Sequence, residues 1–323
     1  MQRHTLLTLC AAAVFATSAL GLATAKPASL MATMSWKGTT SRDWNVGSNW
    51  SGSTVPVAGD IVTIPRAVPE GYQGDPIISN ADGLAGDLTI ASNRTVTVTG
   101  KKLTLDLAVT HDIDGEIRLS ADASVLKVTG AATLDITGKI VLQASGAVLD
   151  LDADVTASGT GGEIEGQDDD AQIQIATDTV LMNSLSIVGN MKVVGETGGA
   201  NAGKLDNRGA VVANADGILK LGLNLLLVDT AGSGRWEASG EPTAVLLFSN
   251  AHTCTLKGNF RVGDCATLRF NADIDTEGSL SHDATNNKGT IDVNNGATFG
   301  YSCNTDDPCV CTDITSDRTL GCP

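Results

Sequence analysis

Glycines recur through most of this chain at intervals of 20 to 29 residues, and an apolar side chain follows two positions after each. A fixed period of this size is typical of a fold built from stacked repeats. The glycines are Gly86, Gly115, Gly138, Gly162, Gly189, Gly209, Gly234, Gly258 and Gly278. The apolar residues after them are Leu88, Ile117, Ile140, Ile164, Met191, Val211, Trp236, Phe260 and Leu280. The period constrains the fold more strongly than any motif constrains the function.

Between the glycines, apolar and polar residues alternate, as in Thr95–Thr99 and Leu103–Leu107. Period two places one set of side chains on one face of a β-strand. The segments are short and are bounded by Gly, Asn, Asp and Ser, which favour turns. After the first 25 residues, no long stretch has the 3.6-residue period of an amphipathic helix. The pattern therefore predicts an all-β protein.

We expect a right-handed parallel β-helix, a solenoid of roughly nine rungs stacked ~4.8 Å apart. The apolar residue after each glycine should point into the core. Each glycine should lie at a corner that needs a positive φ or a close backbone approach. A β-sandwich also has short strands and frequent turns, but it does not predict a constant apolar offset after periodic glycines.

The chain divides into five predicted segments. Residues 1–25 have a basic start, an apolar run and the small-residue site Ala23-Thr24-Ala25, which indicate a secretory signal peptide. Residues 26–34 read as a leader, 35–80 as a Trp-rich cap with the first strands, 81–300 as the β-helix and 301–323 as a Cys-rich cap. No other run is apolar and long enough to span a bilayer. We expect a secreted or cell-surface protein, with the periplasm a remaining alternative.

Six cysteines follow the predicted signal peptide, and an even number in an exported chain favours disulfides over metal binding. They are Cys254, Cys265, Cys303, Cys309, Cys311 and Cys322. The last four crowd the polar tail, where three pairings are open. We expect them to form a disulfide-linked cap at the C-terminal end of the solenoid.

The net charge of −16 argues against nucleic acid and anionic membrane surfaces as partners. Acidic residues just before repeat glycines and on one strand could instead bind calcium through carboxylate oxygens. These candidates are Asp112, Asp114, Asp150, Asp152, Asp154, Asp273 and Asp275. Because none matches a known calcium-binding loop, ordinary exposed acidic turns are the favoured interpretation. We expect no other cofactor.

Three of the four tryptophans cluster near the N-terminus, at Trp36, Trp44 and Trp50. Trp44–Gly52 leads into Val55-Pro56 and then Gly59-Asp60-Ile61-Val62-Thr63-Ile64. This order resembles the W…NW…G…P…GD.V.I opening that precedes β-helical regions in many bacterial exported surface proteins. Such proteins look like the pectin-lyase-like superfamily and the passengers of autotransporter-like adhesins. The resemblance covers about 30 residues and implies an exported β-helical surface protein.

The three tryptophans are candidate glycan contacts, since aromatic faces pack on sugar rings. The favoured interpretation is a cap, because an open solenoid end exposes apolar core and strand edges. Trp236 occupies the inward repeat position, so we assign it to the core.

The pectin-lyase-like resemblance also implies catalytic motifs, and these are missing. The chain has Asp168-Asp169-Asp170 but neither the Gly-His-Gly nor the Arg-Ile-Lys of polygalacturonases. Pectate lyases pair an arginine base with Asp-bound calcium. Arg118 and Arg261 each lie three positions after a repeat glycine, but six rungs apart, so they cannot share a site. We assign no catalytic residue.

The sequence therefore favours a non-catalytic, monomeric extracellular or surface protein whose role is adhesion or the binding of matrix or glycan. A polysaccharide lyase or hydrolase with an unfamiliar site is the first alternative, although it depends on fold analogy alone. It requires a groove with clustered Asp, Arg or Lys from neighbouring rungs. A structural spacer in a surface layer is the second alternative.

Overall fold

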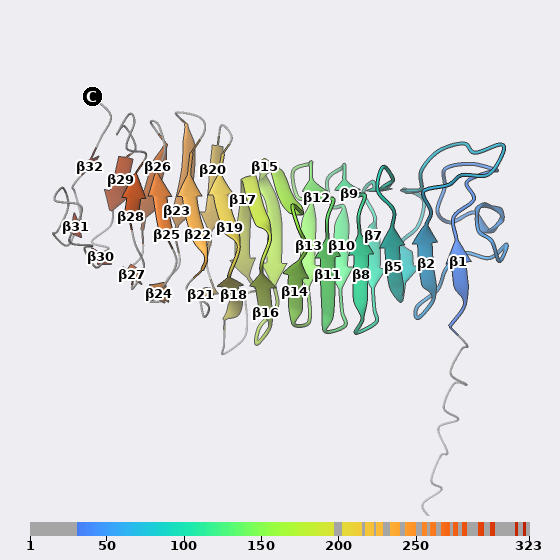
Figure 1. The fold of residues 1–323 in the computed structure, drawn as a ribbon, viewed down its shortest axis with the longest axis horizontal. Coiled ribbons are helices and arrows are strands. Elements are labelled where there is room, and N and C mark those ends of the chain that lie inside the picture. Colours follow the sequence, from blue (N-terminus) through green and yellow to red (C-terminus); the bar gives the residue numbers. More distant parts are fainter. Residues whose placement is uncertain are drawn as a thin grey trace, which may run out of the picture. The chain divides into compact units, whose positions relative to one another are not determined.

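The computed structural model describes residues 31–196 without a break. Beyond them it describes residues 202–214, 217–222, 224–228, 233–239, 243–249, 254–256, 259–262, 266–271, 274–276, 280–282, 290–293, 298–300, 314–315 and 319–320. These residues form β-strands joined by turns, with one short 3-10 helix, η1 (Gly47–Asn49). Figure 1 shows the strands stacked side by side in sequence order along a solenoid. The predicted all-β parallel β-helix is confirmed.

The first face of the solenoid is a nine-stranded parallel sheet. Its strands are β1 (Thr33–Ser35), β2 (Ile61–Ile64), β5 (Asp87–Ile90), β8 (Thr110–Ile113), β11 (Ala132–Ile136), β14 (Val155–Ser158), β16 (Val180–Asn183), β18 (Gly203–Asn207) and β21 (Leu225–Val228). The strands β24 (Cys254–Leu256), β27 (Ile274–Thr276) and β30 (Thr298–Gly300) form a further parallel ladder, and β24 lies against β21.

The second face begins at the corner that follows each strand of the first face. It contains β3 (Ile77–Ile78), β6 (Thr95–Val98), β9 (Glu116–Leu119), β12 (Lys139–Leu142), the first parts of β15 (Glu163–Ile175) and β17 (Ser186–Gly195), β19 (Ala210–Ala213), β22 (Arg235–Ala238), β25 (Asn259–Val262) and β28 (Leu280–His282).

The third face completes each rung. It contains β4 (Gly83–Ala85), β7 (Lys102–Leu105), β10 (Val125–Val128), β13 (Val148–Leu151), the second parts of β15 and β17, β20 (Gly217–Leu221), β23 (Ala244–Phe248), β26 (Thr267–Phe270) and β29 (Thr290–Val293). The second and third faces count as one sheet because β15 and β17 continue around the corner between them.

The inward side chains form columns that run through the stacked rungs. On the second face, Ile117 pairs with Ile140, which pairs with Ile164, and all three are fully buried. The same column continues through Ile187, Val211, Trp236 and Phe260. The predicted inward positions from Leu88 to Phe260 are all buried, while the side chain of Leu280 lies outside the described residues.

The apolar residues that follow two of the nine glycines, Gly86 and Gly189, do not belong to this column. Gly86 precedes β5, so Leu88 points inward from the first face and stacks on Val62. Gly189 lies within β17, where its φ of +97° carries the strand around the second corner. Met191 is buried as expected, but on the third face, and Ile187 occupies this rung's position in the second-face column.

The corner glycines of the second face are required by close backbone approach. A Cβ added at Gly138 would lie 1.8 Å from the carbonyl oxygen of Gly115 one rung below. At the corresponding corner before Ile187 the chain has Leu185, and the buried Asn183 supports the turn. The Asn183 amide donates to the Leu185 carbonyl oxygen at 3.1 Å, and its oxygen accepts from the Leu185 N–H at 3.2 Å. A side-chain hydrogen bond from Asn183 to Asn207, at 3.0 Å, links this corner to the next rung.

Residues of the tryptophan motif build the N-terminal end of the solenoid. The buried Asn49 accepts hydrogen bonds from the backbone N–H groups of Thr40 and Ser41, both at 3.0 Å. Its amide donates to Ser41 Oγ and to the Asp43 carbonyl oxygen, both at 2.9 Å. Asp60, also buried, accepts from Ala32 and Val57. The polar motif residues therefore satisfy backbone groups of the turns that they join.

Trp36, Trp44 and Trp50 are at most 2% exposed and pack edge to face, with ring centroids 4.9 and 4.7 Å apart. The candidate glycan-contact role of these rings is therefore wrong, because no ring face is open to a sugar. They cover the core at the first rungs, as the cap interpretation expected.

Antiparallel pairs occur at both ends of the parallel ladders. Near β1, Trp36 and Trp50 form an antiparallel bridge, and the Ser51 N–H donates to the Ser35 carbonyl oxygen. At the other end, β31 (Ile314–Thr315) pairs antiparallel with β30, and β32 (Thr319–Leu320) pairs antiparallel with β29. These pairs occupy backbone edges on which another strand could otherwise add.

One inward position of the first face holds a histidine. His111 is fully buried in the column between Leu88 and Leu134. Its Nδ1 accepts from the Leu88 N–H at 3.3 Å, while its Nε2 has no partner among the described residues. Burial lowers the pKa of His111 to about 4, against the attraction of Asp112 and Asp106. The ring is therefore neutral at pH 7.

The inward column predicts the effect of a truncation. Ile140→Ala should lower the free energy of unfolding by about 2–5 kcal/mol, because it leaves a cavity in a fully buried column. Lys139→Ala, at the neighbouring outward position, is the matched control and should change it by well under half as much. Urea denaturation measures both. Equal effects at the two positions would contradict the assigned register.

His111 predicts a pH dependence of stability. Between pH 6.5 and about 4 the unfolded chain binds a proton that the folded chain excludes, so stability falls as the pH is lowered through this range. The effect approaches about 3 kcal/mol near pH 4. His111→Leu should remove it, so the variant gains on the wild type as the pH falls from 7 to 4. Urea denaturation across that range is the measurement, and parallel curves for the two proteins would refute the prediction.

Candidate functional site

The outward side chains of the second face form two ladders that cross the rungs. One ladder begins immediately after each corner and the other lies two positions later. The first contains Glu116, Lys139, Glu163, Ser186, Ala210 and Arg235. The second contains Arg118, Val141, Glu165, Val188, Val212 and Glu237. Neighbouring rungs therefore bring charged residues of both signs together.

The ladders lose their charges at β17 and β19. Ser186, Val188, Ala210 and Val212 occupy the outward positions there, and the last three form a small apolar cluster of their own. A hollow of about 360 Å³ is lined in part by Val188, and a second hollow of about 380 Å³ is lined in part by Ser186 and Ala210. We call this region the trough: its floor is Ser186, Val188, Ala210 and Val212, and its banks are the charged residues of β15 and β22.

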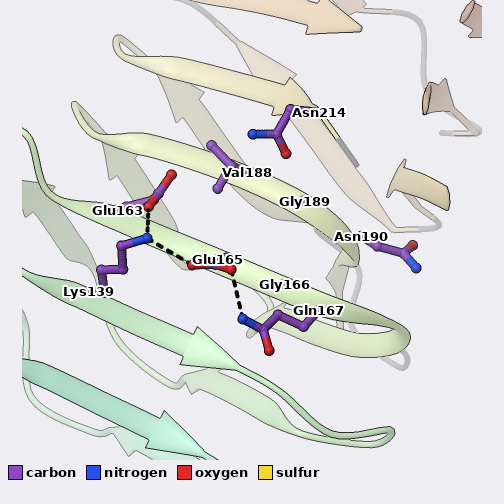
Figure 2. A pocket seen from close by; sticks show the side chains of 9 residues that line it. All are labelled: Lys139, Glu163, Glu165, Gly166, Gln167, Val188, Gly189, Asn190 and Asn214. Carbon is purple, nitrogen blue, oxygen red and sulfur yellow. Dashed lines mark hydrogen bonds and ion pairs between the residues drawn. The ribbon is translucent and has the colours of Figure 1, made fainter. Parts of the chain in front are cut away.

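The first hollow lies beside the β15 bank, and Figure 2 shows Lys139 between two glutamates there. Lys139 Nζ lies 2.6 Å from Glu163 Oε2 and 3.0 Å from Glu165 Oε2. The Gln167 amide donates to Glu165 Oε1 at 2.8 Å. Asn190 and Asn214 complete the polar lining.

Lys139 and Glu165 of this bank are held in their charged forms. Hydrogen bonds to Glu163 and Glu165 raise the pKa of Lys139. Burial alone would raise the pKa of Glu165, but hydrogen bonds from Gln167 and Lys139 lower it overall. A general acid needs a raised carboxyl pKa and a lysine base needs a lowered one, so the shifts of Lys139 and Glu165 oppose both roles.

The second hollow lies at the other end of the same strands, where they leave the first corner. Arg208 and Arg235 line it together with the corner segments around Gly162 and Gly209. Arg208 Nη2 lies 2.9 Å from Asp206 Oδ2, and Arg235 Nε lies 3.1 Å from Glu237 Oε2.

The two arginines named from the sequence lie in the second ladder, six rung steps apart as predicted. Arg118 Nε pairs with Glu116 Oε1 at 2.5 Å, and Arg261 Nη1 lies 3.8 Å from Glu237 Oε1. Each therefore joins a local ion pair.

The calcium candidates are not brought to one place. Asp150 and Asp152 both pair with Lys127, at 2.8 and 2.7 Å, and Asp154 accepts from the Val180 N–H. Asp112 points outward beside Asp135, and burial together with Asp135, Asp87 and Asp114 raises the pKa of Asp112. The side chains of Asp273 and Asp275 lie outside the described residues.

The acidic triplet lies at a bulge in β15, between the second and third faces. Carboxylate oxygens of Asp168, Asp169 and Asp170 lie within 4.8 Å of one another, at exposed or half-buried positions. Lys192 Nζ pairs with Asp170 Oδ1 at 2.5 Å. The triplet is therefore an exposed acidic bulge within a strand, with Lys192 as a counterion.

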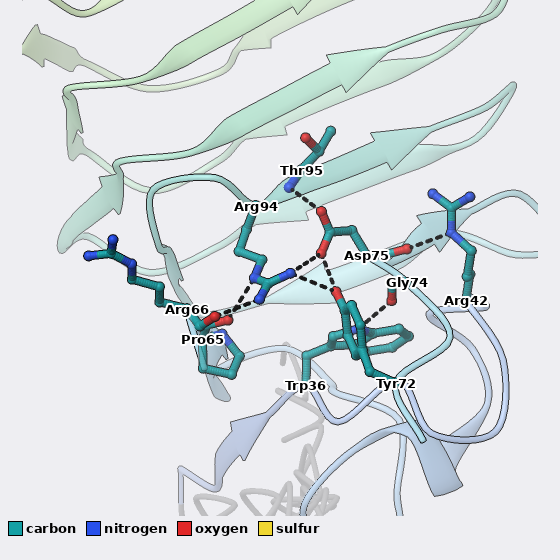
Figure 3. Close-up of polar contacts among 9 residues, drawn as sticks. All are labelled: Trp36, Arg42, Pro65, Arg66, Tyr72, Gly74, Asp75, Arg94 and Thr95. Carbon is teal, nitrogen blue, oxygen red and sulfur yellow. Dashed lines mark hydrogen bonds and ion pairs between the residues drawn. The ribbon is translucent and has the colours of Figure 1, made fainter. Parts of the chain in front are cut away.

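A second polar cluster, shown in Figure 3, fastens the loop between β2 and β3. Arg94 Nε donates to the Pro65 carbonyl oxygen at 3.0 Å, and its Nη1 pairs with Asp75 at 3.3 Å. Asp75 also accepts from Tyr72 and from the Thr95 N–H. Burial and then Asp75 raise the pKa of Tyr72 to about 12. The cluster therefore holds the loop in place and does not present reactive groups.

The six cysteines and the predicted signal peptide lie outside what the structure describes, except that Cys254 opens β24. Their side chains and the expected disulfides stay predictions. Among the described residues, no helix is long and apolar enough to cross a membrane.

The sequence did not single out Lys139, Glu163 and Glu165. The available signal was the residue directly after each corner glycine, which faces outward because the next residue faces inward. Reading this position in register gives Glu116, Lys139 and Glu163 in succession.

Residues 35–158 match the family model for a domain of unknown function, DUF8693. The matched segment contains the tryptophan motif and the rungs up to the end of β14, so it includes Lys139 but none of the other residues that line the trough. Neither a curated protein nor a solved structure matches the chain.

The charge pattern of the β15 bank can be tested by titration. In Lys139→Met, the pKa of Glu165 should rise relative to the wild type, since one of its two stabilising hydrogen bonds is lost. Carbon-13 NMR of the glutamate carboxyls measures the shift, with Lys127→Met, on the third face, as a matched control. If the pKa of Glu165 is unchanged in Lys139→Met, the hydrogen bond from Lys139 does not stabilise the charged form of Glu165.

Proposed function

We propose that this protein is an exported, non-catalytic β-helix protein that binds a surface, matrix or glycan component from the outer face of its solenoid. The observation that carries the proposal is the trough, a hollowed region with polar banks whose charged lining residues are paired within the protein. The predicted signal peptide and the resemblance of the tryptophan motif to exported β-helical surface proteins support the location.

The pKa shifts of the β15 bank support binding over turnover. Lys139 and Glu165 keep their charges, so neither group is poised to transfer a proton at neutral pH. Hydrogen-bonding groups fixed in this way favour a stable complex with a polar ligand.

A polysaccharide lyase or hydrolase is the second candidate. The observation that favours it is the gathering of Glu116, Arg118, Lys139, Glu163 and Glu165 from three neighbouring rungs, which is the kind of cluster that this alternative requires. The spacer alternative has less support, because antiparallel pairs occupy strand edges at both ends of the solenoid and so oppose end-to-end stacking.

The two leading functions can be separated in one experiment. The mature protein is incubated with neutral and acidic polysaccharides, with and without calcium, and reducing ends, unsaturated uronate absorbance and bound glycan are measured. We expect retained glycan without new products.

Product formation that disappears in Glu163→Gln, but persists in the distant control Asp150→Asn, would establish the enzyme instead. If no polysaccharide is retained and none is cleaved, the glycan part of the proposal is wrong.

A further inference from the structure

We propose that the trough binds an uncharged, hydroxyl-rich glycan chain that lies along β17 and β19, across the solenoid rather than along its axis. The inference depends on the proposed function and specifies its site, its ligand class and the direction of the ligand. It starts from the placement of the two hollows.

The hollows lie at opposite ends of the same strands. The second reaches Ser184–Ser186 at the start of β17, and the first reaches Val188–Asn190 further along that strand. The small floor residues separate them, while the longer charged side chains of β15 and β22 stand on either side. A chain seated in both hollows therefore runs parallel to the strands.

The charges of the lining favour an uncharged ligand. Each charged lining residue already has an opposite partner: Lys139 with Glu163 and Glu165, Arg208 with Asp206, and Arg235 with Glu237. A charged ligand group would have to compete with one of these pairs. A hydroxyl group can donate to a carboxylate oxygen or accept from a guanidinium N–H without breaking the pair.

The polar lining complements the hydroxyl groups of a sugar ring. Val188, Ala210 and Val212 are only 6%, 8% and 7% exposed, so the floor adds little apolar contact, while the amides of Gln167, Asn190 and Asn214 border the first hollow. A pyranose presents hydroxyl groups at its edge, and these can meet the amides and the charged banks. The lining that the structure describes contains no aromatic ring, which makes hydrogen bonding the main source of affinity.

The net charge of the whole protein also favours an uncharged ligand over an acidic one. With a net charge of −16, the chain repels polyuronates at long range. Calcium-bridged binding of an acidic polysaccharide would need free carboxylates in the trough, and Glu163 and Glu165 share Lys139 instead.

Calorimetric titration of the mature protein tests the ligand class. The probes are hexamers of neutral glucan and of chitin, the cationic hexamer of glucosamine, and the anionic hexamer of galacturonate. We expect a neutral hexamer to bind, with an affinity that stays within about twofold between low and high salt, because no charge pair forms. Binding of the cationic or the anionic hexamer alone, with loss at high salt, would overturn the assignment.

The trough itself is tested with two variants. Ser186→Arg places a long side chain on the floor and should weaken binding about tenfold or more, which corresponds to about 1.4 kcal/mol. Glu163→Gln keeps the shape of the bank and should weaken binding less. Gln174→Arg is the matched control, since Gln174 is also half-buried and faces outward from β15, but on the third face. Circular dichroism melting checks that all three variants fold.

The outcomes separate this inference from the proposed function. If glycan binding is unchanged in Ser186→Arg, the trough is not the binding site, but the proposed binding function stands. Absence of binding by every hexamer would contradict both. Loss of binding in the folded Ser186→Arg variant but not in Gln174→Arg supports the trough.

Discussion

Each rung of this solenoid must return the chain to a point one strand spacing, about 4.8 Å, from where it began. At the corner that leads to the second face, the backbone of one rung then lies against the backbone of the next. Gly138 faces the Gly115 carbonyl oxygen so closely that no side chain fits between them. Once the corners stack in this way, the inward residues that follow fall into columns, and the columns supply the continuous core.

The same stacking leaves the outward positions free to vary. Glu116, Lys139 and Glu163 occupy equivalent outward positions, and each lies in register with its neighbour on the adjacent rung. Opposite charges on successive rungs pair across the strand spacing. A rung with small uncharged side chains forms a depression between the longer charged side chains on either side. A binding surface can thus arise from changes at outward positions without disturbing the fold.

Sequence reasoning recovered the fold because its signal is repeated many times. The inward alternation and the corner glycines recur in almost every rung, and Gly86 and Gly189 also lie at corners, although not at the corner before the second face. The Leu185 corner was not foreseen: Asn183 supports it locally, but the partner of Asn183 in the next rung, Asn207, is adjacent only after stacking.

The candidate site was harder to predict for a related reason. Lys139 is 24 residues from Glu163, and their 2.6 Å contact exists only in the correct register between two rungs. The sequence pointed instead to acidic residues that are close in sequence, such as Asp150 and Asp152, which the structure pairs with Lys127. The tryptophans were the most conspicuous sequence feature near the N-terminus, and their burial assigns them to packing.

The number of rungs between the two banks sets the distance between them. The two banks are separated by the two uncharged rungs of β17 and β19, so their distance is a whole number of strand spacings. Insertion or loss of one complete rung there would move the banks by one such step, about 4.8 Å, while every bank residue kept its own surroundings. Changes in rung number would therefore alter the width of the trough in discrete steps, a form of variation that point substitutions in a globular site do not offer.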